Sequence, residues 1–214
     1  MSLIALFPGF ACRSWIWDEL KGELAEKHDL IPIDWPVDPG GMYNTPGALA
    51  DWAIEAHLPR GTEMMLIGHS MGGLVAMEVA TRLGCMVKGV VLLETFLTPP
   101  SEFFQNLLMD SAPDDLRSRV VAMLARGKQE SSDALRTSLG RVDYLDTAHG
   151  LADKLIAIYG DRGCGDVARV CRALDWPAPL NDQVALHVVP DACHFPMLEN
   201  PESVLRILRD VGAP

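Results

Sequence analysis

The chain alternates between short apolar runs and longer amphipathic stretches, and this alternation predicts its architecture. Six runs are apolar over most of their length, which is typical of strands buried on both faces of a parallel sheet. They cover residues 2–7, 29–34, 63–69, 87–94, 154–160 and 183–189. Stretches with helical spacing lie between them, at residues 14–27, 46–58, 71–83, 166–174 and 201–211. Strands that alternate with helices predict βαβ units, and therefore an α/β fold with a doubly wound, mostly parallel sheet.

One long segment interrupts this alternation. Residues 96–153 contain no strand pattern, only helical patterns such as PDDLRSRVVAMLARG and SSDALRTSLGRV. We therefore expect a core formed by residues 1–95 and 154–214, with residues 96–153 inserted as a small helical lid over one end of the sheet. The alternative is a pair of extra packing helices that have no gating role.

Composition and charge argue against several classes of function. The 214 residues are 49% hydrophobic and 22% charged, which is typical of one globular domain. A formal net charge of -11 disfavours binding to nucleic acid or to anionic membrane surfaces. No apolar run approaches the roughly 20 residues that cross a bilayer. The five cysteines form no CxxC pair, and the chain starts with no basic leader, so we expect a cytoplasmic protein with reduced thiols.

The strongest chemical signal is GHSMGG at residues 68–73, where a predicted strand meets a predicted helix. Gly68, Ser70 and Gly72 fit the pattern G-x-S-x-G. A sharp strand-to-helix turn strains the serine backbone, so the residues two before and two after it must lack side chains. Such a turn exposes the Ser70 hydroxyl at a helix N-terminus and aims the Met71 N–H at a developing oxyanion. The alternative is that the glycines end a strand and the serine caps the next helix.

With two further segments, this motif makes the chain resemble the α/β-hydrolase family, and in particular its small-lid serine esterases. LFPGFACRSWIWDEL is similar to the loop after the family's first central strand, which implies the Phe10 N–H as second oxyanion donor, although Pro8 stands where the family usually has His. PDACHFPMLENPESV resembles the family's histidine segment, which implies His194 as general base. The family's early antiparallel strands have no counterpart here. The cofactor-free esterases of biotin and menaquinone biosynthesis are loosely similar in size.

The carboxylate that would orient His194 has several candidates. The family usually carries Asp three residues beyond the Gly that ends the penultimate strand, and that position is Gly163 here, with Asp161 and Asp166 on either side. A second location follows the strand after the nucleophile helix, where Glu94 resembles the glutamate of the haloalkane-dehalogenase and luciferase branches. Either location serves, because the chemistry requires a geometry rather than a chain position. We favour Glu94, with Asp161 and then Asp166 as alternatives.

The resemblance implies a serine hydrolase that cleaves a small carboxylic ester or thioester through an acyl-enzyme on Ser70, without metal or organic cofactor. Phe10 and Phe96 are expected to line an apolar acyl pocket. Other aromatic candidates for that pocket are Trp15, Trp17, Phe103 and Phe104. A lyase that uses the same serine and histidine for proton abstraction stays open, as does a non-catalytic ligand-binding protein. The expected partner is a small acyl substrate, and the sequence leaves monomer and dimer open.

Overall fold

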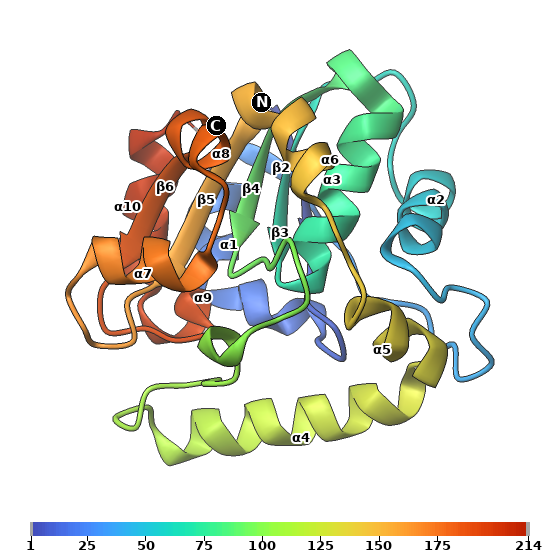
Figure 1. The fold of residues 1–214 in the computed structure, drawn as a ribbon. Helices are drawn as coiled ribbons and strands as arrows, with labels where there is room; N and C mark the ends of the chain where they lie inside the picture. Colours follow the sequence, from blue (N-terminus) through green and yellow to red (C-terminus); the bar gives the residue numbers. More distant parts are fainter. Residues whose placement is uncertain (1, 213–214) are drawn as a thin grey trace.

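The computed structural model describes residues 2–212, and a single six-stranded sheet lies at their centre (Figure 1). The strands are β1 Ser2–Phe7, β2 His28–Pro32, β3 Met64–His69, β4 Val87–Leu93, β5 Leu155–Gly160 and β6 Ala185–Val189. The α-helices are α1 Asp18–Ala25, α2 Pro46–Ala56, α3 Met71–Leu83, α4 Asp114–Glu130, α5 Asp133–Leu139, α6 Leu145–Gly150, α7 Val167–Leu174, α8 Ala178–Gln183, α9 Pro196–Glu199 and α10 Pro201–Asp210. Over the same residues, none of these helices is both long and apolar enough to span a bilayer.

The sheet is parallel throughout, in the order β2-β1-β3-β4-β5-β6. The chain first moves outward from β1 to β2, and then crosses back to place β3 on the other side of β1. The loops that follow β1 and β3 therefore diverge and open a crevice at the carboxyl edge, which is where α/β sheets bind ligands. The predicted α/β fold with a mostly parallel sheet is confirmed. Among residues 2–212, every strand pair in this sheet is parallel.

Helices cover both faces of the sheet, and the core is divided accordingly. In β1, Ala5 and Phe7 pack into the part of the core that includes α2 and α3, whereas Ile4 and Leu6 pack into the part that includes α1 and α10. Successive side chains of a strand point to opposite faces, so a strand covered on both sides needs apolar residues at every position. Each fully buried aliphatic side chain contributes about 1.5–3 kcal/mol relative to an exposed one.

The structure confirms the six predicted strands and the five predicted helices, and it moves several of their bounds. Residues 14–27 form a short 3-10 turn, Ser14–Trp17, followed by α1. Helices α8 and α9 were not predicted, because six and four residues are too few to show a helical period. Strand β4 ends at Leu93, so Glu94 lies beyond it, with a positive φ of 53°.

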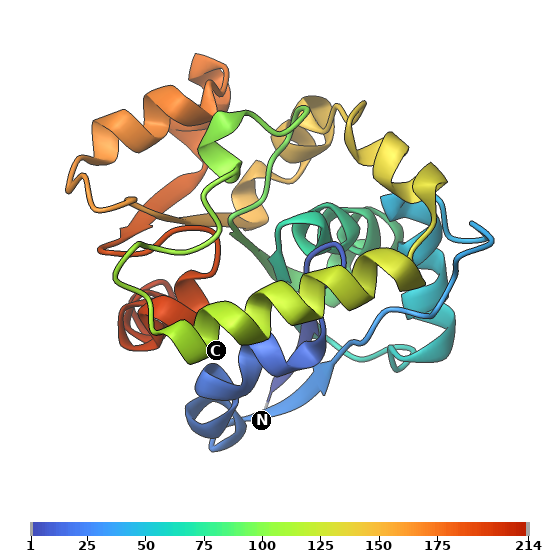
Figure 2. The ribbon, with the colours of Figure 1, turned by 90° about the horizontal axis from the view of Figure 1, so that it is seen from below.

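The inserted residues 96–153 hold α4, α5 and α6 and no strand, as the sequence predicts. Helix α4 crosses below the carboxyl edge of the sheet, seen from the side in Figure 1 and from underneath in Figure 2. Its Gly127 lies directly on the loop after β1, since a Cβ there would stand 2.2 Å from the Ala11 carbonyl oxygen. The helix therefore rests backbone to backbone on that loop.

This contact predicts opposite effects for two Gly→Ala substitutions in helices. Gly127→Ala should lower the free energy of unfolding by about 1–3 kcal/mol, because the added methyl group collides with the Ala11 carbonyl. Gly22→Ala in α1 is the matched control, because nothing lies within 4 Å of its Cβ position. It should raise stability by about 0.5–1 kcal/mol. Urea unfolding followed by tryptophan fluorescence measures both, and a stabilised Gly127→Ala variant would contradict the packing of α4.

Candidate active site

Ser70 lies at the junction of β3 and α3 in a conformation that side chains rarely adopt, with φ of 54° and ψ of −122°. Its backbone N–H donates to the Leu93 carbonyl of the neighbouring strand at 2.8 Å, which holds the turn against the sheet. A Cβ at Gly68 would lie 2.4 Å from the Gly72 carbonyl oxygen, and one at Gly72 would lie 2.1 Å from the Phe7 carbonyl oxygen. Only glycine fits at both positions, so the glycines serve the turn rather than merely ending a strand.

Two chain segments that carry the predicted backbone donors, Met71 and Phe10, adjoin this serine. Met71 is the first residue of α3, and the first N–H groups of a helix have no partner within it. Phe10 belongs to the loop after β1, where Ala11 has a φ of 60° and the Cys12 N–H donates to the Gly9 carbonyl at 3.1 Å. Gly9 must be glycine, since a Cβ there would lie 2.8 Å from His69 Nδ1 and 3.2 Å from Ser70 Cβ. The loop after β1 is therefore packed directly against the serine turn.

Trp35 anchors the loop after β1. This loop contains Pro8, at the position where the resemblance described above leads one to expect a histidine. The indole Nε1–H of Trp35 donates to the carbonyl oxygens of Pro8 and Gly9, both at 3.1 Å. The ring also stacks on Phe7, with 6.2 Å between ring centroids. Trp35 was not predicted to have this role, and its only signal in the sequence is a tryptophan shortly after the second strand.

His194 follows β6 and faces the same crevice. Its Nδ1–H donates to Glu94 Oε2 at 3.4 Å, which leaves Nε2 free to accept a proton. The backbone of His194 is fixed on both sides, because its N–H donates to the Leu107 carbonyl at 3.1 Å and its carbonyl accepts from His69 Nε2 at 2.7 Å. Within residues 2–212 no hydrogen bond joins the Ser70 hydroxyl to this ring, and such bonds are often long in unliganded active sites.

His69 supports this arrangement as a neutral ring. It is fully buried, and its ring packs at a tilt against the rings of His194 and Phe195, with ring centroids 4.8 and 4.9 Å away. Burial, and then the charge of His194, hold the pKa of His69 well below its usual value. The ring therefore stays uncharged while its Nε2–H positions the His194 backbone.

Glu94 is the carboxylate that reaches His194, and it is completely buried. Arg162 binds it in a bidentate manner, Nη1 to Oε1 at 2.7 Å and Nη2 to Oε2 at 2.6 Å, and the Gly160 N–H donates to Oε1 at 2.6 Å. Burial alone would raise the pKa of the Glu94 carboxyl, but the hydrogen bonds and positive charge of Arg162, assisted by His194, lower it below its usual value. Glu94 is therefore ionised at neutral pH.

The two alternative acids are occupied elsewhere. The Asp161 carboxylate accepts from the backbone N–H groups of Gly163 at 2.7 Å, Gly165 at 3.0 Å and Asp191 at 2.8 Å, so it organises two neighbouring loops. Asp166 is the N-cap of α7, where its side chain accepts from the Ala168 N–H at 2.9 Å.

Ser70 and His194 line one cavity of about 400 Å³ at the carboxyl edge of the sheet. Phe10 and Phe96 line it as predicted, and Phe104 and Leu107 add further apolar surface. The remaining lining residues are Gly9, Cys12, His69, Pro100, Leu124, Lys128, Arg136, Leu139, Gly140 and Phe195. The cavity thus combines a reactive end with mostly apolar walls, as small-molecule sites usually do.

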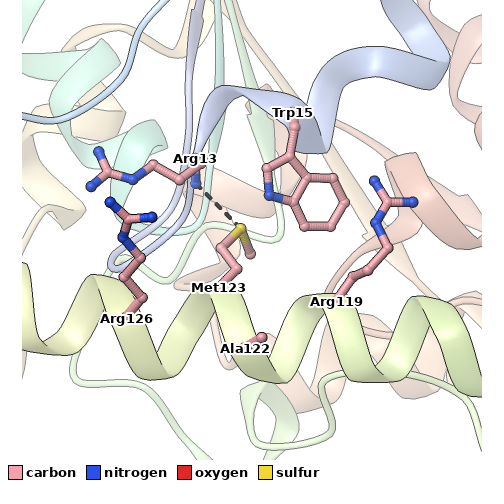
Figure 3. Close-up of a pocket in the computed structure, with 6 residues that line it drawn as sticks. All are labelled: Arg13, Trp15, Arg119, Ala122, Met123 and Arg126. Atoms are coloured by element: carbon pink, nitrogen blue, oxygen red, sulfur yellow. Dashed lines mark hydrogen bonds between the residues drawn. The ribbon is translucent and has the colours of Figure 1, made fainter.

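Of the four other aromatic candidates, Phe104 lines this cavity, whereas Trp15, Trp17 and Phe103 do not. Trp17 is fully buried in the core. The Phe103 ring packs under the Arg162 guanidinium, whose Cζ lies 3.5 Å from the ring centroid. Trp15 lines a separate cavity of about 440 Å³ on the other side of α4, together with the residues that Figure 3 labels. There the Arg119 guanidinium lies 4.4 Å from the centroid of the Trp15 ring, and the Arg13 N–H donates to Met123 Sδ at 3.3 Å (Figure 3).

The residues around this second cavity fasten α4 to the core. Arg13 and Arg126 both bind the Glu130 carboxylate, so one acidic side chain joins α4 to the loop after β1. Among residues 2–212, no group of three or more His, Cys, Asp or Glu side chains is arranged to hold a metal ion.

A model of a known family matches nearly the whole chain, over residues 4–207, and its description is Alpha/beta hydrolase family. The chain belongs to this family. Solved structures with the same fold include a thermophilic esterase from Thermogutta terrifontis, with 22% identity, 100% of this chain and 90% of that chain covered, and a TM-score of 0.73. A hydrolase from Oleispira antarctica has 13% identity, covers 99% of this chain and 90% of that chain, and gives a TM-score of 0.77. At these identities the likeness concerns the fold alone.

Two curated proteins are similar over part of the chain. Over 98 residues the chain is 35% identical to the biotin biosynthesis bifunctional protein BioHC of Cellvibrio japonicus, which is 42% of this chain and 18% of that protein. Over 116 residues it is 28% identical to the nonribosomal peptide synthetase agiA of Aspergillus flavus, which is 49% of this chain and 2% of that protein. The chain therefore matches only a small part of either relative.

The buried pair of Glu94 and Arg162 predicts a stability effect that depends on pH. Arg162→Met leaves the Glu94 carboxylate buried without its cation, so the free energy of unfolding at pH 7 should fall by about 3 kcal/mol. The pKa of Glu94 is lowered in the folded protein, so the stability it contributes is present above the ordinary carboxyl pKa of 4.5 and is lost as the pH falls below it. The difference between variant and parent should therefore shrink at about pH 4.

The matched control removes an arginine from a surface pair. Arg209 binds Glu23, and both side chains are partly exposed, at 52% and 38%. Arg209→Met should cost less than about 1 kcal/mol at either pH. Chemical unfolding at the two pH values measures the free energy of unfolding of the parent and of both variants. If Arg162→Met lowered the free energy of unfolding by the same amount at both pH values, the charged Glu94 carboxylate would not depend on Arg162.

Proposed function

We propose that this protein is a serine hydrolase that cleaves a small carboxylic ester, or a thioester, through an acyl-enzyme on Ser70. One observation carries the proposal. A serine held at positive φ on a helix N-terminus shares a cavity with a histidine whose other ring nitrogen donates to a buried, ionised carboxylate. This is the set of roles that nucleophilic acyl transfer requires.

In the proposed reaction, Ser70 Oγ forms a bond to the acyl carbon while its proton passes to His194 Nε2. The Glu94 carboxylate holds the ring in the tautomer that has Nε2 free and stabilises the imidazolium. The carbonyl oxygen, now negative, accepts from the N–H groups of Phe10 and Met71, each worth about 3 kcal/mol in comparable chemistry. His194 then returns the proton to the departing alcohol as the C–O bond breaks.

The second half of the reaction repeats these steps with water. His194 takes a proton from a water molecule, whose oxygen attacks the acyl-enzyme, and the same two N–H groups stabilise the oxyanion. The proton returns to Ser70 Oγ, and the acid leaves. Residues 96–153 act in this proposal as a lid, because the walls of the cavity include side chains from this segment such as Phe104 and Leu124.

The nucleophile has a direct test. Ser70→Ala should lower kcat for hydrolysis of 4-nitrophenyl butyrate by at least about 10⁴-fold, because among residues 2–212 no other serine, threonine or tyrosine lines the cavity. A fluorophosphonate probe should label the parent chain at Ser70, as located by mass spectrometry, and should leave the variant unlabelled. Ser203→Ala is the control, since Ser203 is a buried serine in α10, outside the cavity. Labelling at another residue, or full turnover by Ser70→Ala, would exclude the covalent mechanism.

The acid has a comparative test. Glu94→Gln should lower kcat by about 10³–10⁴-fold, because an amide no longer stabilises the imidazolium. Asp161→Asn should leave kcat within about threefold of the parent, since Asp161 orders loops and does not contact the ring. Both variants are assayed well below their melting temperatures, which circular dichroism determines. Two equally mild losses would mean that another group orients His194.

A further inference from the structure

The charge of the cavity that holds Ser70 is one-sided. Lys128 and Arg136 are the only Lys, Arg, Asp or Glu side chains in its lining, and both are cationic. The whole chain carries a net charge of -11, with 29 acidic and 18 basic residues. A cavity lined by two cations and no carboxylate therefore runs against the composition of the protein. Its apolar walls would also strengthen the field of these charges inside the cavity.

The two cations belong to the exposed part of the cavity lining, whereas Ser70 and His194 belong to its buried part. Ser70 and His194 are buried, at 7% and 8% exposure, whereas Lys128 and Arg136 are exposed. Lys128 lies in the last turn of α4 and Arg136 in α5, so both come from the inserted segment. They therefore form a cationic mouth above a mostly apolar interior.

Neither cation is fully paired with a carboxylate of the protein itself. Among residues 2–212 no carboxylate lies within ion-pair distance of Lys128. Arg136 binds Asp133, but both side chains are largely exposed, at 58% and 88%, and such surface pairs contribute little. The carboxylate two residues after Lys128, Glu130, binds Arg13 and Arg126 at the cavity shown in Figure 3. Both Lys128 and Arg136 thus keep N–H donors for a ligand.

Resting on the proposed function, we infer that the substrate is an anionic ester, with a carboxylate or phosphate at the end remote from the scissile bond. The acyl carbonyl lies at Ser70, the intervening chain packs on the phenylalanines, and the anion binds Lys128 and Arg136. Arginine suits this role because its planar guanidinium can form paired hydrogen bonds with an oxyanion, and lysine adds a point charge. The anion belongs either to the acyl part or to the alcohol part, and the experiment separates these two sources.

The test compares pairs of esters in which a free carboxylate is replaced by its uncharged methyl ester. On the acyl side, the mono-4-nitrophenyl ester of adipic acid is compared with its neutral methyl 4-nitrophenyl diester. On the alcohol side, 4-(butyryloxy)benzoate is compared with its methyl ester. For one of these pairs, kcat/KM of the parent should be higher for the anionic member by at least about tenfold. The preference should shrink as NaCl is raised from about 0.05 to about 0.5 M.

The variant Lys128→Gln/Arg136→Gln should abolish this preference, because kcat/KM for the anionic ester should fall at least about tenfold more than kcat/KM for the neutral ester. The matched control is Arg126→Gln/Arg141→Gln, which removes two charges from the same inserted segment. Both of these side chains are exposed and line other cavities. The control should retain the preference. Equal losses in the two double variants would mean that net charge, rather than the mouth, attracts the substrate.

Failure of this inference can be distinguished from failure of the proposed function. If the neutral esters are hydrolysed but neither anionic ester is preferred, the inference is wrong and the hydrolase proposal stands. If no ester is hydrolysed, calorimetry with monomethyl adipate and with 4-(butyryloxy)benzoate on Ser70→Ala measures binding without turnover. Binding of either anion that weakens at least about tenfold when Lys128 and Arg136 are also replaced by Gln supports the anion site. Absence of such binding overturns it.

Discussion

The N-terminus of α3 rests on the carbonyl groups that end β1, and the candidate site depends on this backbone contact. Because Gly72 has no side chain, the first turn of the helix can approach the Phe7 carbonyl oxygen, to which any Cβ would come within 2.1 Å. That approach fixes the Ser70 hydroxyl and the Met71 N–H relative to the loop after β1. A residue at positive φ costs about 1–3 kcal/mol, and it persists here because packing on every side leaves the turn no alternative.

A second constraint is the buried charge network at the ends of β4, β5 and β6. Glu94, Arg162 and His194 follow three different strands, and the parallel sheet brings them together because its strands all end at the same edge. The approach requires Gly160, since a Cβ there would lie 2.2 Å from the Ala192 carbonyl oxygen. Arg162 makes it possible to bury an ionised carboxylate at full depth, because its two donors replace the water that Glu94 gives up.

The inserted segment connects the two ends of the cavity. Helix α4 presses on the loop after β1 through Gly127, so it bears on the position of the Phe10 N–H. The basic side chains on its two sides have different partners. Beside Trp15, Arg13 and Arg126 share the Glu130 carboxylate, and these bonds fasten the helix to the core. Toward the cavity that holds Ser70, Lys128 has no carboxylate partner among residues 2–212, so the same helix presents a positive charge to whatever enters.

The sequence by itself determined the alternation of strands and helices and the serine turn, and it predicts the insertion at residues 96–153. These features are local, because burial on both faces of a sheet and a strained turn each leave a mark on consecutive residues. It also indicated Ser70, His194, Phe10 and Met71, whose segments are recognisable one at a time. The short helices α8 and α9 escaped it, because a helical period needs more residues than they contain.

Only the tertiary structure decided which carboxylate meets the histidine. Glu94, Asp161 and Asp166 all follow strands near the same edge, and nothing in the neighbouring residues tells which of them points at His194. The structure gives Asp161 three backbone N–H donors and makes Asp166 a helix cap, and it gives Glu94 a buried arginine. Trp35, Arg162, Lys128 and Arg136 were equally invisible in sequence, because their roles are contacts between segments far apart in the chain. Such contacts depend on distances in space, which a linear pattern does not record.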